Sequence, residues 1–183
     1  YANPFTIKEK GADYSIIKLS MGEVFIEQVN GFDAISSNSK GNTQNIGKPQ
    51  LPTYTFNYSI DYDKDYTVNL EVGDYILYEN INLLPTQSFK KFNEEKVFVK
   101  DTEFYNSFTQ YPEQKIESKR MSLRGYELLG VEVTPYEYNP KSKELKVFTD
   151  INITISESGY RENNQRVPRS QAFESMYKNY VIN

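Results

Sequence analysis

The chain of 183 residues contains no cysteine, no histidine and no tryptophan. Without cysteine it can form neither disulfides nor thiolate metal sites, and it has no thiol nucleophile. Without histidine, a Ser-His-Asp triad, a Cys-His dyad and an imidazole-bound zinc ion are all excluded. The sequence therefore predicts a domain that is not an enzyme and that contains no metal or other cofactor.

Long apolar runs and an excess of basic residues are also missing. No stretch approaches the ~20 apolar residues that cross a bilayer, so no membrane span is expected. The net charge of -4 and the isoelectric point near 5.1 argue against nucleic acid as a partner, because neutralising phosphates requires a basic face. The first residues show no basic and apolar signal segment, so we expect that a signal peptide was either removed or never present.

Aromatic residues are abundant, with 16 Tyr and 11 Phe, and they favour strands because their rings suit half-buried pleated faces. Short segments rich in aromatic and β-branched residues recur between Gly, Asn, Asp and Pro. The expected strands are residues 13–17, 24–29, 53–60, 67–72, 75–84 and 96–99. This pattern predicts an all-β fold, an antiparallel β-sandwich or jelly-roll-like domain that spans residues 1–183.

The clearest local signal lies within residues 131–155, where two alternating runs flank a polar turn. Apolar residues recur at every second position on both sides, which is the period of a strand with one buried face. Between the runs, Asn139-Pro140 suits a turn because proline fixes φ and lacks an N–H. These residues predict a β-hairpin.

One segment near the C-terminus has the pattern of a helix. Apolar residues from Ala172 to Tyr180 follow a helical spacing, and the hydroxyl of Ser170 can cap the first turn. We expect a short helix over about residues 170–180 that docks on the sandwich, with docking on a partner as the alternative. The polar residues 36–45 and 156–169 predict an exposed loop and a flexible segment.

Five short motifs occur in an order that is typical of one known family. They are Gly47-Lys-Pro49-Gln-Leu51-Pro52, Tyr111-Pro112, Leu123-Arg124-Gly125, Val133-Thr-Pro135-Tyr-Glu-Tyr138-Asn139-Pro140 with Leu145-Lys-Val-Phe148, and Ser170-Gln-Ala-Phe173-Glu-Ser-Met-Tyr177 with Asn179-Tyr180. In these motifs the chain resembles the propeptide domain of gingipain-type cysteine peptidases, over roughly residues 20–180.

The resemblance implies an N-terminal propeptide that acts as an intramolecular chaperone and keeps a secreted peptidase latent. Its partner would be the cognate caspase-like catalytic domain, in cis before cleavage. The propeptide would cover the active-site cleft and insert a basic side chain into the pocket for the substrate's P1 residue. The resemblance also implies export in a Gram-negative bacterium by type IX secretion, through the periplasm to the cell surface or the medium.

The resemblance further suggests where the inhibitory side chain lies. In the family, the basic residue sits in a loop several residues past a strand that here ends at Leu84-Pro85. The candidates at that position are Lys91 and, second, Lys90. A solvated lysine pair on a surface loop is the alternative interpretation.

Other basic residues are candidates for further roles. Arg120 and Arg124 are secondary interface candidates, although an arginine that enters a strand more often pairs with a carboxylate of its own fold. The candidate cleavage positions are Arg161, Arg166, Arg169 and Asn183.

The main alternative function is a non-catalytic β-sandwich binding or adhesion module of a surface protein. Paired carboxylates, Glu94-Glu95 or Glu132 with Glu137, could be proposed for glycosidic chemistry, but solvated surface charge is the ordinary explanation. Residues 61–65 have the spacing that opens a calcium loop, yet they lack the glycine of its sharp turn. We therefore expect an acidic turn between strands there.

Overall fold

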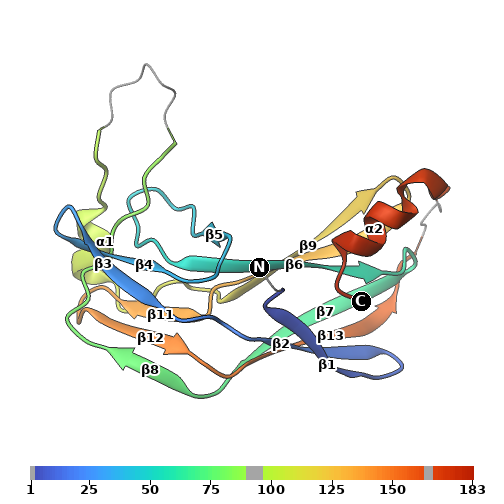
Figure 1. The fold of residues 1–183 in the computed structure, drawn as a ribbon, viewed down its shortest axis with the longest axis horizontal. Coiled ribbons are helices and arrows are strands. Elements are labelled where there is room, and N and C mark those ends of the chain that lie inside the picture. The colour runs from blue at the N-terminus through green and yellow to red at the C-terminus, as the bar shows by residue number, and fades with distance from the viewer. Residues whose placement is uncertain (1–2, 90–96, 163–166) are drawn as a thin grey trace.

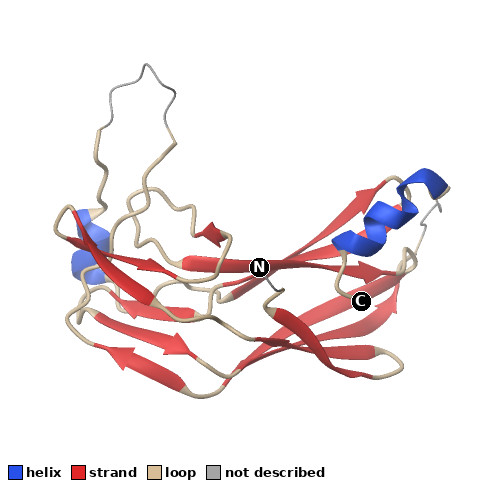
Figure 2. Ribbon diagram, in the orientation of Figure 1, coloured by secondary structure: helices blue, strands red, loops and turns tan. Residues whose placement is uncertain are grey.

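The computed structural model describes residues 3–89, 97–162 and 167–183 of the chain (Figures 1 and 2). The strands are Phe5–Lys10 (β1), Tyr14–Leu19 (β2), Phe25–Val29 (β3), Phe32–Ser36 (β4), Gly41–Asn42 (β5), Pro52–Ile60 (β6), Lys64–Val72 (β7), Tyr75–Tyr78 (β8), Ile116–Leu123 (β9), Tyr126–Val133 (β10), Tyr136–Asn139 (β11), Glu144–Phe148 (β12) and Ile151–Tyr160 (β13). The helical elements are Thr102–Ser107 (α1), the 3-10 turn Gln171–Phe173 (η1) and Glu174–Tyr180 (α2).

Two four-stranded sheets enclose the main core. One has the strand order β1-β2-β13-β7 and the other the order β5-β6-β10-β9. A three-stranded sheet, β11-β12-β8, and the β3-β4 hairpin extend the fold at the end that carries α1 (Figure 1). The pairings between these strands are antiparallel, so the predicted all-β antiparallel fold is confirmed.

The core forms because alternate residues of each strand point inward. Ile153 and Ile155 of β13 are buried in one layer, and Phe56 and Val131 of β6 and β10 are buried in the other. In the middle of β6, the alternating Thr55 is exposed. This two-residue period buries one face of each sheet in the main core.

The predicted hairpin is present as β11 and β12. Tyr136 pairs with Val147 and Tyr138 pairs with Leu145, and all four are buried. The hydroxyl of Tyr138 donates to the carbonyl of Ile81 at 2.7 Å, which satisfies its polar atom inside the core. The turn and the run at residues 145–148 were therefore placed correctly. The run at residues 131–133 belongs instead to β10, which pairs with β6 and β9, and residues 151–155 belong to β13, which pairs with β2 and β7.

Several element predictions were wrong. The expected strand at residues 75–84 ends at Tyr78, because Asn80 has a positive φ of 59° and turns the chain. Residues 97–99 form no strand, and position 96 lies outside the described residues. Strands β1, β4 and β9 and helix α1 were not predicted. Part of the expected loop 36–45 is also a strand, since β5 pairs with β6.

The flexible segment predicted from Ser156 was wrong at its start. β13 continues to Tyr160 and pairs with β7 past a bulge between Glu157 and Gly159. The carboxylate of Glu157 also binds the Lys64 ammonium at 2.8 Å across the two strands. Polar residues can therefore belong to a strand here, because the neighbouring strand β7 supplies both the backbone hydrogen bonds and the lysine that pairs with Glu157.

The C-terminal helix docks on the sandwich, which was expected, and not on a partner, which was the alternative. Phe173 and Tyr177 pack with Tyr126 and Leu128 of β10 in a small apolar cluster of their own. The Tyr177 hydroxyl hydrogen-bonds to the Glu127 carbonyl at 2.8 Å. The predicted cap was wrong, because the Ser170 side chain makes no capping bond and the segment begins instead as the 3-10 turn η1.

The residues after α2 cover an edge of β6. The N–H of Ile182 donates to the carbonyl of Asn57 at 3.0 Å. The side-chain amide of Asn183 accepts from the Ser59 N–H at 2.6 Å and donates to the Ser59 carbonyl at 3.0 Å. Since β5 reaches only the start of β6, this tail satisfies edge groups that would otherwise be open to another strand.

The turn between β9 and β10 depends on a glycine. Arg124 and Gly125 have φ values of 51° and 82°, as a two-residue type I′ turn requires. A Cβ atom on Gly125 would lie 2.5 Å from the carbonyl oxygen of Pro168, so the chain before α2 passes directly over this turn. Gly31 has the same role between β3 and β4, at φ 79°, but with open space around it.

We predict that Gly125→Ala lowers the free energy of unfolding by about 2–4 kcal/mol, because strain in the left-handed region adds to overpacking against Pro168. The matched variant Gly31→Ala should cost only about 1–2 kcal/mol, for the backbone strain alone. Urea unfolding followed by circular dichroism measures both. Equal losses in the two variants would show that the Pro168 contact is not a constraint.

Glu137 of β11 lies between two lysines. Its carboxylate is 2.6 Å from Lys115 and 3.0 Å from Lys146. Burial raises the pKa of Glu137, but the hydrogen bonds from Lys115 and Lys146 outweigh it, so the pKa falls below its ordinary value of 4.5. A folded-state pKa below the unfolded one means that these pairs stabilise the fold above about pH 4.5, and that this stability is lost as the pH falls through the folded pKa.

We therefore predict that Glu137→Gln lowers the free energy of unfolding at pH 7 and that its difference from the wild type shrinks as the pH falls from about 5 toward 2. Urea titrations at several pH values measure this. The control is Glu71→Gln on the exposed face of β7, which forms no ion pair within the described ranges. A pH-independent effect of Glu137→Gln would contradict the prediction.

Candidate functional site

The candidate site is the segment of residues 86–100, called the arm below, which leaves the sandwich at the end that carries α1 and the β3-β4 hairpin (Figure 1). The predicted anchors Lys90 and Lys91 lie outside the described residues, as do Glu94 and Glu95. The described part of the arm is therefore its two stems, residues 86–89 and 97–100. Their placement decides where the intervening residues start and end.

Both ends of the arm are bonded to one short segment of backbone. The N–H of Gly47 donates to the Thr86 carbonyl, and the N–H of Thr86 donates to the Lys48 carbonyl, both at 2.8 Å. At the other end, the N–H of Asp101 donates to the Gly47 carbonyl at 2.9 Å. Gly47 has a φ of 80°, and a Cβ there would lie 3.1 Å from the Asp101 nitrogen. The stems are thus held side by side by a glycine that allows close approach.

One side chain joins the stems above this root. The amide of Gln87 donates to the Val99 carbonyl at 2.7 Å and accepts from the Val99 N–H at 2.9 Å. An amide side chain used in this way replaces one strand-like pair of backbone hydrogen bonds. Gln87 therefore prevents the two stems from separating where the arm leaves the domain.

The second stem also rests on aromatic rings. The rings of Phe98 and Phe32 have centroids 5.6 Å apart, and the Lys100 ammonium lies 5.3 Å from the Phe32 ring and 4.7 Å from the Tyr105 ring. The next residue, Asp101, caps α1 by accepting from the Phe104 N–H at 2.9 Å. Stem, helix and hairpin therefore form one packed unit.

The stems become exposed as they leave this unit. Phe89 is 100% exposed and Val97 is 62% exposed, although both are apolar. The arrangement fixes both ends of the segment between the stems.

Arg120 is bound within its own fold. Its guanidinium donates to the Glu127 carboxylate at 2.9 Å and to the carbonyls of Lys64 and Asp61 at 2.8 Å. It therefore ties β9 and β10 to the turn between β6 and β7. The acidic turn expected at residues 61–65 is present at residues 61–63, and residues 64 and 65 belong to β7. Its role at an interface stays a prediction.

Arg124 occupies the type I′ turn before β10. Its guanidinium carbon lies 5.4 Å from the ring centroid of Phe173, so it stabilises the docking of the C-terminal helix. A role for Arg124 at an interface is likewise still a prediction.

The cleavage candidates that can be placed are held by the fold. Arg161 forms an ion pair with Asp65 at 3.5 Å, and the guanidinium carbon of Arg169 lies 5.1 Å from the ring centroid of Tyr126. Asn183 is bonded to β6 as described above, and Arg166 lies outside the described residues. Cleavage at these positions remains a prediction.

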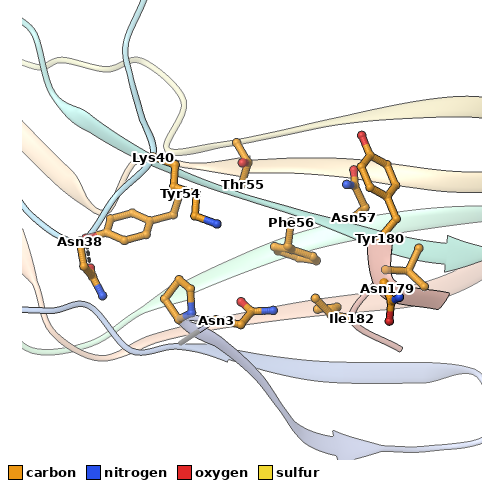
Figure 3. Close-up of a pocket in the computed structure, with 12 residues that line it drawn as sticks. Asn3, Asn38, Lys40, Tyr54, Thr55, Phe56, Asn57, Asn179, Tyr180 and Ile182 are labelled. Atoms are coloured by element: carbon orange, nitrogen blue, oxygen red, sulfur yellow. Dashed lines mark hydrogen bonds between the residues drawn. The ribbon is translucent and has the colours of Figure 1, made fainter. Parts of the chain in front are cut away.

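A shallow cavity of about 230 Å³ lies beside β6, between the N-terminal residues and the tail after α2 (Figure 3). Four of its twelve lining residues are asparagines, among them Asn38 and Asn57, and the Tyr54 hydroxyl donates to Asn38 at 3.0 Å. No group of three or more acidic, histidine or cysteine residues in the described ranges could hold a metal ion. Nor is any helix of those ranges long and apolar enough to span a membrane.

Glu132 and Glu137, which were considered for glycosidic chemistry, lie on different strands, and one of them is bound by lysines. Glu132 is on β10 and Glu137 is on β11, where the two lysines bind it. Burial raises the pKa of Glu132, and a hydrogen bond from Thr53 opposes that change. Gly47 was noticed as part of a motif, but sequence reasoning missed Gln87, since an isolated glutamine carries no pattern.

Two solved structures from Porphyromonas gingivalis have a similar fold. One is the complex of the RgpB pro- and mature domains, with 18% identity and a TM-score of 0.85 over 100% of this chain and 97% of that chain. The other is from work on the zymogenic latency of gingipain K, with 18% identity and a TM-score of 0.73 over 86% of this chain and 93% of that chain. No curated protein sequence matches the chain.

The family itself is established by a match along the sequence. The model of the Propeptide_C25 family matches residues 9–181, which include both stems of the arm and the C-terminal helix. The resemblance seen in the five motifs is therefore confirmed. Because the match extends over nearly the whole chain, this protein belongs to the Propeptide_C25 family and is a non-catalytic prodomain.

Proposed function

We propose that this domain is the N-terminal propeptide of an exported gingipain-like cysteine peptidase and that it keeps the enzyme latent through its arm. The arm would enter the active-site cleft, and Lys91 or Lys90 would occupy the pocket for the P1 side chain. The observation that carries the proposal is the root of the arm, where Gly47 and Gln87 fix both stems.

A fixed root suits an inhibitor for a physical reason. A free loop loses conformational entropy when it binds, whereas an arm whose ends are already held loses less of it. A rigid arm can also hold its backbone away from the position that cleavage needs. A basic side chain in a desolvated acidic pocket then supplies both affinity and specificity.

The same proposal covers folding and export. The domain would act as an intramolecular chaperone for the caspase-like catalytic domain that follows it in cis. The precursor would travel by type IX secretion, through the periplasm to the cell surface or the medium of a Gram-negative bacterium. The family match and the fold shared with two gingipain prodomains support this proposal over an adhesion module.

We predict that the double variant Lys90→Ala/Lys91→Ala weakens inhibition of the cognate catalytic domain by about 2 kcal/mol or more, roughly 30-fold, because a buried charged anchor is lost. Titration of the separately prepared domain against the enzyme, with Lys and Arg peptide substrates, measures this. Lys8→Ala/Lys10→Ala on the exposed part of β1 is the control and should change little. Unchanged inhibition by the arm variant would remove the lysines from this role, and no inhibition by the wild type would overturn the function.

We also predict that Gln87→Ala weakens inhibition about 3- to 10-fold without unfolding the domain, because the loss of two hydrogen bonds lets the stems separate. Hydrogen exchange should show faster exchange at the Val99 amide, which Gln87 protects. Gln110→Ala, at an exposed position after α1, is the matched control. Faster exchange with unchanged inhibition would mean that a fixed root is not needed for latency.

A further inference from the structure

The β3-β4 hairpin exposes apolar side chains on one face. Residues 25, 27 and 29 alternate with Ile26 along β3, and Ile26 packs toward the core opposite Ile35. On the outer face, Phe25 is 52% exposed and Val29 is 37% exposed. A hairpin normally turns its apolar face inward, so apolar residues on both faces indicate that the outer face has its own partner.

This face is continuous with the root of the arm. Val29 pairs across the strands with Phe32, so their side chains lie on the same face. The Phe32 ring is in turn in contact with the ring of Phe98 in the second stem, which is 48% exposed. We call Phe25, Val29, Phe32 and Phe98 the hairpin patch. Its size, on the order of 300 Å², is that of apolar patches with a function.

We propose that the hairpin patch is a docking surface for the rim of the same peptidase cleft that receives the arm. This inference rests on the proposed function and adds the surface that must be covered for the arm to work. The short distance along the chain between the patch and the arm lysines favours this partner. Phe98 and Lys91 are seven positions apart in the sequence, so the two are at most about 25 Å apart along the chain. A catalytic domain of a few hundred residues is about 40–50 Å across, so an enzyme that holds the lysine is large enough to reach the patch.

The chemistry of the patch fits this position. Apolar contacts around a buried charged anchor exclude water and so strengthen the anchor's pairing. Glu27 lies on the same face between Phe25 and Val29 and forms no ion pair with any residue of the described ranges. The rim that covers the patch should therefore be apolar, with a basic side chain facing Glu27.

The test uses Phe25→Ser/Val29→Ser in the whole domain, with both arm lysines intact. We expect about 10-fold or greater weakening of inhibition of the cognate catalytic domain. The matched control is Ile76→Ser/Leu77→Ser on β8, where the two side chains are 51% and 45% exposed but lie on a different sheet from the hairpin. Unchanged inhibition by the hairpin variant, or equal losses in both variants, would overturn the inference.

Hydrogen exchange of the wild-type domain, free and in complex, gives a second measurement. It uses no variant, so misfolding of a variant cannot affect the result. Protection of the amides of residues 25–32 on binding is the expected result, and no change there would overturn the inference. Self-association of the free domain that Phe25→Ser/Val29→Ser abolishes would assign the patch to a second copy and also overturn it. If the wild type fails to inhibit at all, the proposed function fails instead, so the two failures are distinct.

Discussion

The pairing of Thr86 and Asp101 with the backbone at Gly47 is the contact on which the rest of the site depends. It brings together two points of the chain that are far apart in sequence from Gly47, and it sets the separation of the two stems. A residue larger than glycine would meet the Asp101 backbone, so the motif at this position has a steric cause. The arm, helix α1 and the β3-β4 hairpin all take their places relative to this contact.

The opposite end of the domain has a separate organisation. Phe173 and Tyr177 form their own small cluster on β10, and the tail after them covers the edge of β6. A small cluster stabilises less than a large core, so this end should open at a lower free energy than the sandwich. A prodomain that is joined to its enzyme beyond this end, as proposed, could thus keep its inhibitory arm in place while its connection to the enzyme is cut.

Local patterns were sufficient for some elements and not for others. The β11-β12 hairpin was found because alternation, Asn139 and Pro140 all agree on one structure, and the C-terminal helix was found because its apolar residues repeat with one period. β9 was missed because it is an edge strand in which charged and polar residues dominate, and α1 was missed because it is only 6 residues long. The root of the arm could not be predicted for a different reason. Gln87 and Val99 are twelve residues apart, and their hydrogen bonds form only when the folded domain brings the two stems together.

The distribution of basic groups gives a reason why an inhibitory charge would come from the arm. In the body of the domain, Arg120 and Lys115 are committed to carboxylates or carbonyls of their own chain. Lys48 and Lys100, the lysines nearest the root, lie over aromatic rings. Moving Arg120 or Lys115 into a partner's pocket would leave a partly buried carboxylate unpaired and would cost stability. An inhibitory residue in the arm, as proposed, would leave these contacts of the body in place when it is substituted.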